Sequence, residues 1–200
     1  MTTEYEVAKQ KLLNLDFKNC EEYFKKNKLY LELGYCELLK GNLGNAKSFF
    51  ANISHINPRA HWALRMIQFI EGYVTFLPTY FEIRNFLEID IHLLLKANKM
   101  EWVENIINGD DLFYSVNGES YKFIARVLMY DDYPEVAKIY LDKGINNSYG
   151  DPELHIILAD YWIYKKNIEN AIKVLKNCIR ILPDYYPAKK RLKDIETFSI

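Results

Sequence analysis

Apolar residues recur every three to four positions along most of the chain, a spacing that places them on one face of a helix. Two such patterns, separated by a polar turn at 165–167, lie between Pro152 and Pro183. Asp151 favours a helix start, because it can accept hydrogen bonds from free N–H groups and the proline after it suits the first helical position. Pro183 ends the second pattern, because proline cannot continue a helix. The stretch therefore predicts two helices joined by a short turn.

The same two-helix pattern recurs with a period of 34 residues, with starts at Arg84, Gly118 and Pro152. Another well-formed unit starts at Asn27, but it lies 125 residues before Pro152, which is not a multiple of 34. The register must therefore break between these units. We expect repeats near 1–26, 27–60, 84–117, 118–151 and 152–185, an irregular segment at 61–83, and a polar-faced capping helix over 186–198.

The break falls where the pattern of the preceding unit fails. A helix is expected from Trp62, but Pro78 arrives early and Tyr80 stands where a small residue is needed. An apolar pattern without a helix breaker then runs from Thr79 to Lys96 and is followed by a turn at 97–99. The segment 61–97 is thus the place where the chain should differ from a plain stack of repeats.

The unit from Pro152 resembles a tetratricopeptide repeat (TPR), in which a Leu-Gly pair, a Tyr, a turn, an Ala, a Phe and a closing Pro follow within 34 residues. These places are taken by Leu158, Ala159, Trp162, Ala171, Leu175 and Pro183. In the unit from Asn27, Leu33, Gly34, Ala46, Phe50 and Pro58 match. The alternative is a helical hairpin outside this family, because His155 replaces the usual bulky residue.

The resemblance implies an all-α fold in one domain, an α-solenoid of about five repeats wound as a right-handed superhelix, with a capping helix at the C-terminus. In this family the first helix of each pair lines a concave groove that binds a peptide or a partner helix. Repeat positions 2, 5, 9 and 12 face the groove. Carried over to this chain, they are Leu31, Tyr35, Leu38, Trp62, Arg65, Phe69, Glu119, Lys122, Arg126, Met129, Glu153, Ile156, Asp160 and Ile163.

These positions predict a groove whose first half is apolar and aromatic and whose second half is charged. Two alternatives remain open. Trp62 and Phe69 would instead be core residues if they packed against a helix over 78–97. Lys122 and Arg126 would have no binding role if they were solvated surface charges.

Composition excludes several classes of protein. Half of the 200 residues are hydrophobic, enough for a sizeable core, and the net charge of −1 gives no general attraction to nucleic acid. The first ten residues, MTTEYEVAKQ, lack the pattern of a secretory signal, and no uncharged run reaches the ~18 residues of a membrane span. Three cysteines without a CxxC motif fit reduced thiols. We therefore expect a soluble, cytoplasmic protein.

No catalytic or metal-binding motif is present. The sequence contains no HExxH, GxxxxGK[ST], GxGxxG or GxSxG, and its four histidines lack metal-ligand spacing. We expect neither enzymatic activity nor a cofactor, and a protein or peptide as partner.

Two other functions are possible. The first is a structural subunit of a homo- or hetero-oligomer, with exposed Leu112, Phe113 and Tyr114 between repeats. The second, binding of nucleic acid or an anionic surface, rests on the nine Lys or Arg against four Asp or Glu between Lys165 and Glu196.

Overall fold

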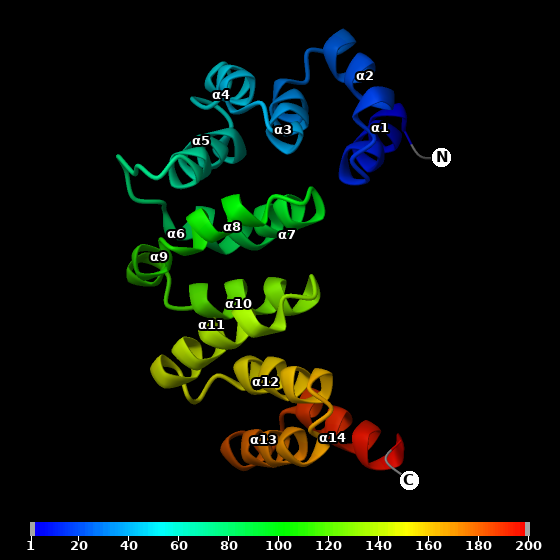
Figure 1. Ribbon diagram of the computed structural model, residues 1–200, viewed down its shortest axis with the longest axis vertical. Coiled ribbons are helices and arrows are strands. Elements are labelled where there is room, and N and C mark those ends of the chain that lie inside the picture. The colour runs from blue at the N-terminus through cyan, green and yellow to red at the C-terminus, as the bar shows by residue number, and fades with distance from the viewer. Residues whose placement is uncertain (1–2, 199–200) are drawn as a thin grey trace. The chain divides into compact units, whose positions relative to one another are not determined.

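The computed structural model describes residues 3–198 (Figure 1). Within this range the regular structure is entirely helical and no strand occurs, so the all-α prediction is confirmed. The chain divides into two compact units, an N-terminal unit up to Asn117 and a C-terminal unit from Gly118 onwards. Each unit is described by itself.

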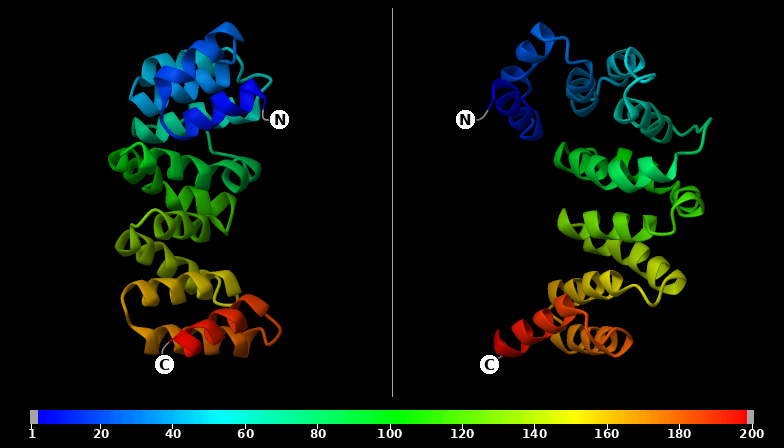
Figure 2. Two further views of the ribbon diagram at one scale, coloured as in Figure 1. Left: turned by 90° about the vertical axis from the view of Figure 1, so that its right-hand side faces the viewer. Right: turned by 180° about the vertical axis from the view of Figure 1, so that it is seen from behind.

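The N-terminal unit contains short helices in hairpin arrangement. Its elements are α1 (Glu4–Leu13), a 3-10 turn η1 (Phe17–Asn19), α2 (Glu21–Lys26), α3 (Tyr30–Lys40), α4 (Leu43–Ala51), α5 (Pro58–Ile70), α6 (Tyr80–Glu82), a π-helical segment η2 (Ile83–Leu87), α7 (Glu88–Lys96), α8 (Met100–Ile107) and α9 (Asp110–Val116). Most helices adjacent in sequence pack against each other, and the pairs α1–α3 and α5–α8 pack although they are not adjacent in sequence (Figure 2).

The C-terminal unit is a series of antiparallel helices that follow one another in chain order (Figure 2). They are α10 (Ser120–Tyr130), α11 (Pro134–Asn147), α12 (Pro152–Tyr164), α13 (Ile168–Ile181) and α14 (Tyr186–Phe198). The helix expected over 186–198 is present as α14. Its Ala188 and Ile195 join Ala159, Ala171 and Leu175 in one buried cluster.

Four turns join the helices at polar interruptions of the apolar pattern, among them the turns expected at 97–99 and 165–167. Each turn contains a residue with left-handed backbone, namely Gly41 (φ 102°), Asn98 (φ 56°), Asp132 (φ 65°) and Lys166 (φ 57°). A left-handed residue stops the helix and reverses the chain within a few residues. The interruption of the apolar pattern is therefore sufficient to locate the hairpin turns.

The segment 79–96 departs from the 34-residue register. It forms one continuous helix through α6, η2 and α7, so Arg84 lies inside this helix and does not start one. The helix begins earlier because Thr79 forms a capping box: its hydroxyl accepts from the backbone N–H of Glu82, and the Glu82 carboxylate accepts from the N–H of Thr79 at 2.8 Å. In the π-helical segment, the side-chain amide of Asn85 donates to the backbone carbonyl of Phe81 at 2.7 Å.

The link between the repeats expected at 84–117 and 118–151 also differs from expectation. Residues 110–116 form the helix α9. Of the three residues expected to be exposed there, Phe113 is fully buried, Tyr114 is half-buried and Leu112 is 39% exposed. The prediction that Phe113 is exposed was therefore wrong. Its ring packs against Phe69, with the two ring centroids 4.8 Å apart.

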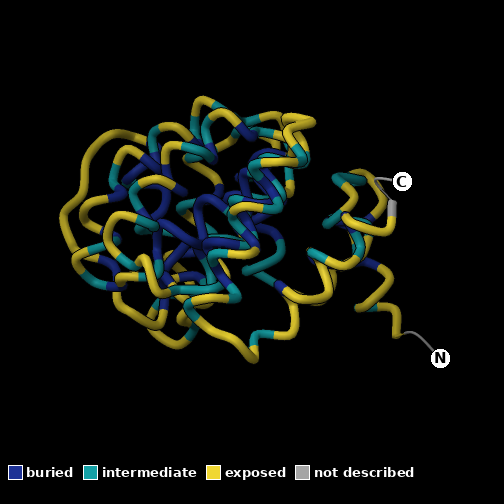
Figure 3. Tube along the Cα trace, turned by 90° about the horizontal axis from the view of Figure 1, so that it is seen from below, coloured by how far each residue is buried: buried dark blue, intermediate teal, exposed yellow. Residues whose placement is uncertain are grey.

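Buried residues lie on the helix faces that turn towards neighbouring helices, and exposed residues on the outer faces and in the turns (Figure 3). Gly34 illustrates how closely the helices approach. A Cβ atom at Gly34 would collide with the ring of Phe50, which is fully buried between α3 and α4. The small residue at this position is thus required by the packing of the α3–α4 hairpin.

We predict that Gly34→Ala lowers the free energy of unfolding by about 1–3 kcal/mol, because the added methyl group overpacks a close helix contact. The matched control is Gly44→Ala, where a Cβ meets no atom within 4 Å and the helical backbone suits alanine. This control should be more stable than the wild type by about 0.5–1 kcal/mol. Urea denaturation of both variants measures the two effects, and equal effects would contradict the packing argument.

Candidate functional site

A buried carboxylate connects three helices of the N-terminal unit. Asp90 of α7 is 1% exposed. It accepts hydrogen bonds from Nη2 of Arg59 at 2.6 Å, from Nε1 of Trp62 at 2.6 Å and from the hydroxyl of Tyr35 at 3.3 Å. These donors come from α3 and α5, so Asp90 holds α7 against both.

The cost of burying this carboxylate explains why so many donors surround it. An unpaired charge in a protein interior is strongly unfavourable. Burial raises the pKa of Asp90, whereas the nearby charge of Arg59 and the hydrogen bonds from Trp62 and Tyr35 oppose this rise. The Arg59 guanidinium itself lies between two rings, 5.1 Å from the ring centroid of Tyr35 and 4.7 Å from that of Phe86. Cation–π contacts of this kind offset part of its desolvation.

A second buried carboxylate joins α5 to α6. Glu82 is 2% exposed, and its Oε1 lies 2.8 Å from Nδ1 of His61 and 3.7 Å from Nε of Arg65. Glu82 and Asp90 together hold the helix 79–96 over one face of α5.

The predicted groove residues of α5 lie under this helix and under α9. Trp62 is fully buried and bonded to Asp90, which agrees with the alternative that it packs against a helix over 78–97. Phe69 is 4% exposed and packs instead against Phe113 of α9. Arg65 is half-buried beside Glu82. These three side chains are therefore used inside the unit.

An apolar pocket of about 310 Å³ lies between α1, α3 and the helix that contains η2 and α7. Its apolar lining consists of Leu12, Leu13, Leu31, Leu39, Phe86, Ile89 and Leu93, and its polar lining of Tyr5, Lys9, Glu32, Tyr35 and Arg59. Tyr35 and Arg59 thus belong both to the pocket and to the Asp90 network. The buried network fixes one side of the pocket.

The walls of the pocket are also connected to one another. The Tyr5 hydroxyl in α1 donates to Oε1 of Glu32 in α3 at 2.8 Å. Partial burial and the Glu32 carboxylate raise the pKa of Tyr5 to about 12. On the opposite side, Lys96 of α7 donates to the backbone carbonyl of Leu13 at the end of α1. Helix α1 is therefore held to both α3 and α7.

Sequence reasoning found only part of this pocket. Leu31 and Tyr35 were predicted to face a groove and both line the pocket, whereas Leu38 is buried, 1% exposed, and does not. The contributions of α1 and α7 were missed. A signal for α7 exists in its two apolar faces, since Ile91 is fully buried while Ile89 is 51% exposed beside the pocket. A helix that is apolar on two sides requires two partners.

In the C-terminal unit, the predicted cations bind acidic residues of the same unit. Lys122 of α10 is 6% exposed, and its Nζ lies 2.8 Å from Glu119, 2.8 Å from Asp151 and 3.1 Å from Glu153. Burial alone would lower the pKa of Lys122, but the hydrogen bonds with Asp151, Glu119 and Glu153 outweigh it and raise the pKa above its ordinary value. Arg126 lies 3.5 Å from the same Glu153 carboxylate.

These ion pairs have a local structural role. Asp151 also caps α12, because its Oδ1 accepts from the N–H of Glu153 at 2.9 Å. Lys122 therefore connects α10 to the start of α12. Of the other predicted residues, Asp160 pairs with Arg191 of α14 at 2.9 Å, Ile156 and Ile163 pack against the α12–α14 core, and Met129 is half-buried.

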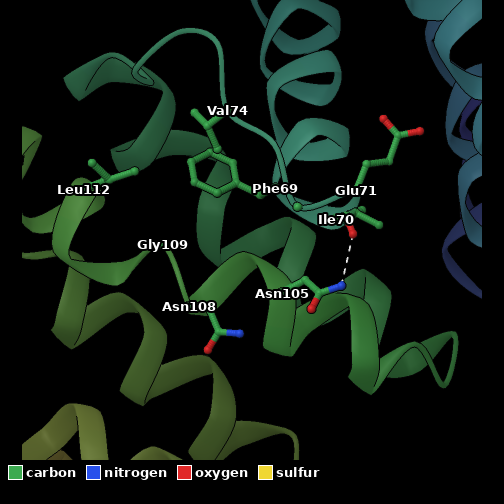
Figure 4. A pocket seen from close by; sticks show the side chains of 9 residues that line it. Phe69, Ile70, Glu71, Val74, Asn105, Asn108, Gly109 and Leu112 are labelled. Carbon is green, nitrogen blue, oxygen red and sulfur yellow. Dashed lines mark hydrogen bonds between the residues drawn. The ribbon is translucent and has the colours of Figure 1, made fainter.

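A second hollow, of about 370 Å³, lies in the N-terminal unit between the loop after α5 and the helices α8 and α9 (Figure 4). Phe69, Val74 and Leu112 contribute apolar walls, and Asn105 donates to the backbone carbonyl of Ile70 at 3.0 Å. No sequence prediction pointed to this hollow, because it depends on α9, which was expected to be a link.

Within residues 3–198, no group of three or more His, Cys, Asp or Glu side chains could hold a metal ion. All three cysteines are buried and form no disulfide, and the sulfur atoms of Cys20 and Cys36 lie 3.9 Å apart. None of the described helices has the length and apolar character needed to cross a membrane.

The Asp90 network leads to a prediction about stability. Trp62→Phe removes a donor from a buried carboxylate and should lower the free energy of unfolding by about 1–3 kcal/mol. Asp90→Asn leaves the guanidinium of Arg59 without its ion-pair partner and should cost about 3 kcal/mol or more. Trp102→Phe in α8, at a half-buried indole, is the control and should cost less than about 1 kcal/mol. Urea denaturation checks the order, and an Asp90→Asn variant as stable as the wild type would refute it.

Lys122→Met should lower the free energy of unfolding by about 1–3 kcal/mol, because it removes the charge-assisted hydrogen bonds of one buried ammonium to Glu119, Asp151 and Glu153. The more exposed pair Lys138–Asp142 provides the control, since Lys138→Met should cost less than about 1 kcal/mol. A lysine whose pKa is raised on folding stabilises fully below its unfolded pKa of about 10.4, and the effect fades as the pH rises through the higher folded pKa. The stability difference should therefore be constant from pH 7 to about pH 10 and shrink above it. A difference that shrinks already below pH 9 would contradict this.

Comparison of the chain with protein-family models, curated proteins and solved structures finds no match.

Proposed function

We propose that this protein is a non-enzymatic, TPR-like scaffold that binds a partner protein through the apolar pocket of its N-terminal unit. The observation that carries the proposal is the pocket itself, in which seven apolar side chains from α1, α3 and the η2–α7 helix surround about 310 Å³. Leu31 and Tyr35, which the TPR resemblance assigns to a partner-binding face, are part of this lining.

The pocket suits apolar side chains of a partner segment. Its volume is about twice the ~150 Å³ cavity that accommodates a benzene ring, so it has room for about two large side chains. An amphipathic helix or an extended peptide presents such residues at regular spacing. Lys9 and Glu32 in the lining offer one charge of each sign to orient the segment.

The network beneath the pocket favours tight binding. Tyr35 and Arg59 are already fixed by Asp90, so a partner loses little free energy in ordering them. Binding sites of this type are mostly formed before the ligand arrives.

Repeat architecture supports the same proposal. The hairpins α10–α11 and α12–α13 share one turn geometry, and the small residues Ala159 and Ala171 are fully buried at the places where the TPR pattern needs them.

Nucleic-acid binding through the basic C-terminal helices is less well supported. Arg191 pairs with Asp160, Lys165 pairs with Glu135 and Lys189 lies 3.7 Å from Asp184. Each of these cations would have to leave a carboxylate in order to reach a phosphate.

The test is selection of random peptides against the intact chain, followed by binding measurements on variants. We expect selected peptides with two or more large apolar residues, whose affinity falls at least tenfold on Ile89→Lys, because the new charge stands in the pocket. Ile139→Lys on α11 is the matched control, since Ile139 is 56% exposed and Ile89 51%. Fluorescence anisotropy with labelled peptides measures both affinities.

Two results would contradict the proposal. One is a failure to select any peptide that binds more tightly than about 100 µM. The other is a set of peptides whose affinity is the same for the wild type and both variants.

A further inference from the structure

The loop after α5 exposes large apolar side chains without a single charge. Residues 72–81, GYVTFLPTYF, contain no Asp, Glu, Lys or Arg, although 26% of the whole chain is charged. Phe76 is 69% exposed and Leu77 is 54% exposed. An uncharged, apolar loop at the surface is costly for solubility, and such surfaces often mark interaction sites.

The hollow of about 370 Å³ lies directly beside this loop (Figure 4). Val74 of the loop forms one wall, and Phe69 and Leu112 form others. The molecule thus presents projecting apolar residues, Phe76 and Leu77, beside a hollow of mixed lining. Its apolar walls come from Phe69, Val74 and Leu112, and Glu71, Asn105 and Asn108 make the rest of the lining partly polar.

The area of this surface is suitable for a dimer. Tyr73, Val74, Phe76, Leu77 and Leu112 are 39–69% exposed, which amounts to on the order of 450 Å² of apolar surface, with a fully exposed aromatic side chain counted at about 200 Å². Two copies contribute about 900 Å². Because roughly 60% of the area of an interface is non-polar, the total surface area buried between the two copies would be about 1,500 Å². This value lies within the range of about 1,200–2,000 Å² for stable interfaces.

Charge does not oppose pairing of two identical surfaces. Glu71 is the one charged residue in the lining of the hollow, and its Oε1 lies 2.7 Å from Nζ of Lys47. Two copies can therefore meet without placing unpaired like charges together. The amides of Asn105 and Asn108 supply a polar edge.

We propose that the chain forms a twofold homodimer in which Phe76 and Leu77 of each copy enter the hollow of the other. In a twofold interface both copies use the same surface. The loop of one copy therefore lies at the hollow of the other, and the second copy's loop lies at the hollow of the first. The interface shares no residue with the proposed partner pocket, so either proposal can fail without the other.

The first experiment is sedimentation equilibrium of the intact chain. The wild type should be a dimer that dissociates in the micromolar range, in keeping with an interface in the lower half of the standard size range. Phe76→Ser/Leu77→Ser should be monomeric at 100 µM with an unchanged circular dichroism spectrum, because both side chains are largely exposed. The control Ile56→Ser/Ile139→Ser removes two apolar side chains of matched exposure, 74% and 56%, and should stay dimeric.

A second experiment tests the geometry. Phe76→Cys and Leu112→Cys, each as a single variant with its own tag, are mixed and oxidised with diamide, an azo compound that takes up the two electrons and two protons released as two thiols form a disulfide. The native cysteines are fully buried or nearly so and serve as an internal background. The mixed 76–112 disulfide between copies should exceed both same-site disulfides.

Several results would overturn the proposal. They are a wild type that is monomeric at 100 µM, a dimer that persists in Phe76→Ser/Leu77→Ser, and open-ended aggregates in place of a closed dimer. A same-site 76–76 disulfide as the main product would refute the insertion geometry. A partner protein that binds this loop to a monomeric chain would likewise refute it.

Discussion

The need to neutralise the buried carboxylate of Asp90 determines how the N-terminal unit is assembled. Its partners Tyr35, Arg59 and Trp62 belong to α3 and α5, 28 to 55 residues away in sequence. Satisfying one charge therefore requires α7 to lie over both helices. Glu82, in α6 of the same continuous helix, is a second buried carboxylate and lies near His61 and Arg65 of α5. Together these contacts place helix 79–96 against α5, whose side chains Trp62 and Arg65 were expected to face a groove.

This placement explains where binding surfaces remain available. The aromatic residues of α5 are used to hold the unit together, and the pocket is formed instead at the other edge of α7, beside α1 and α3. In the C-terminal unit, the buried ammonium of Lys122 likewise lies within ion-pair distance of three carboxylates of the same unit, Glu119, Asp151 and Glu153, which are themselves partly exposed. Charged residues on a predicted binding face are often required internally once they are removed from water.

Two apolar surfaces of the N-terminal unit remain after these requirements are met. The pocket beside Ile89 is concave, partly enclosed and fixed by the Asp90 network, which suits side chains of a partner segment. The loop with Phe76 is projecting and uncharged, which suits insertion into the hollow of a second copy. The two proposals thus follow from shape as much as from composition.

The sequence by itself determined the helical class, the hairpin turns and the final helix, because these depend on local features. Apolar spacing, caps such as Asp151 and interruptions such as 40–42 act within a few residues of chain. Only the tertiary structure decided that Trp62 is core, that residues 110–116 form a helix over Phe69, and that α7 lines a pocket. Each depends on contacts between helices that are distant in sequence. The position of an apolar residue within one helix cannot reveal these contacts, because the same side chain could pack against another helix of the chain or against another protein.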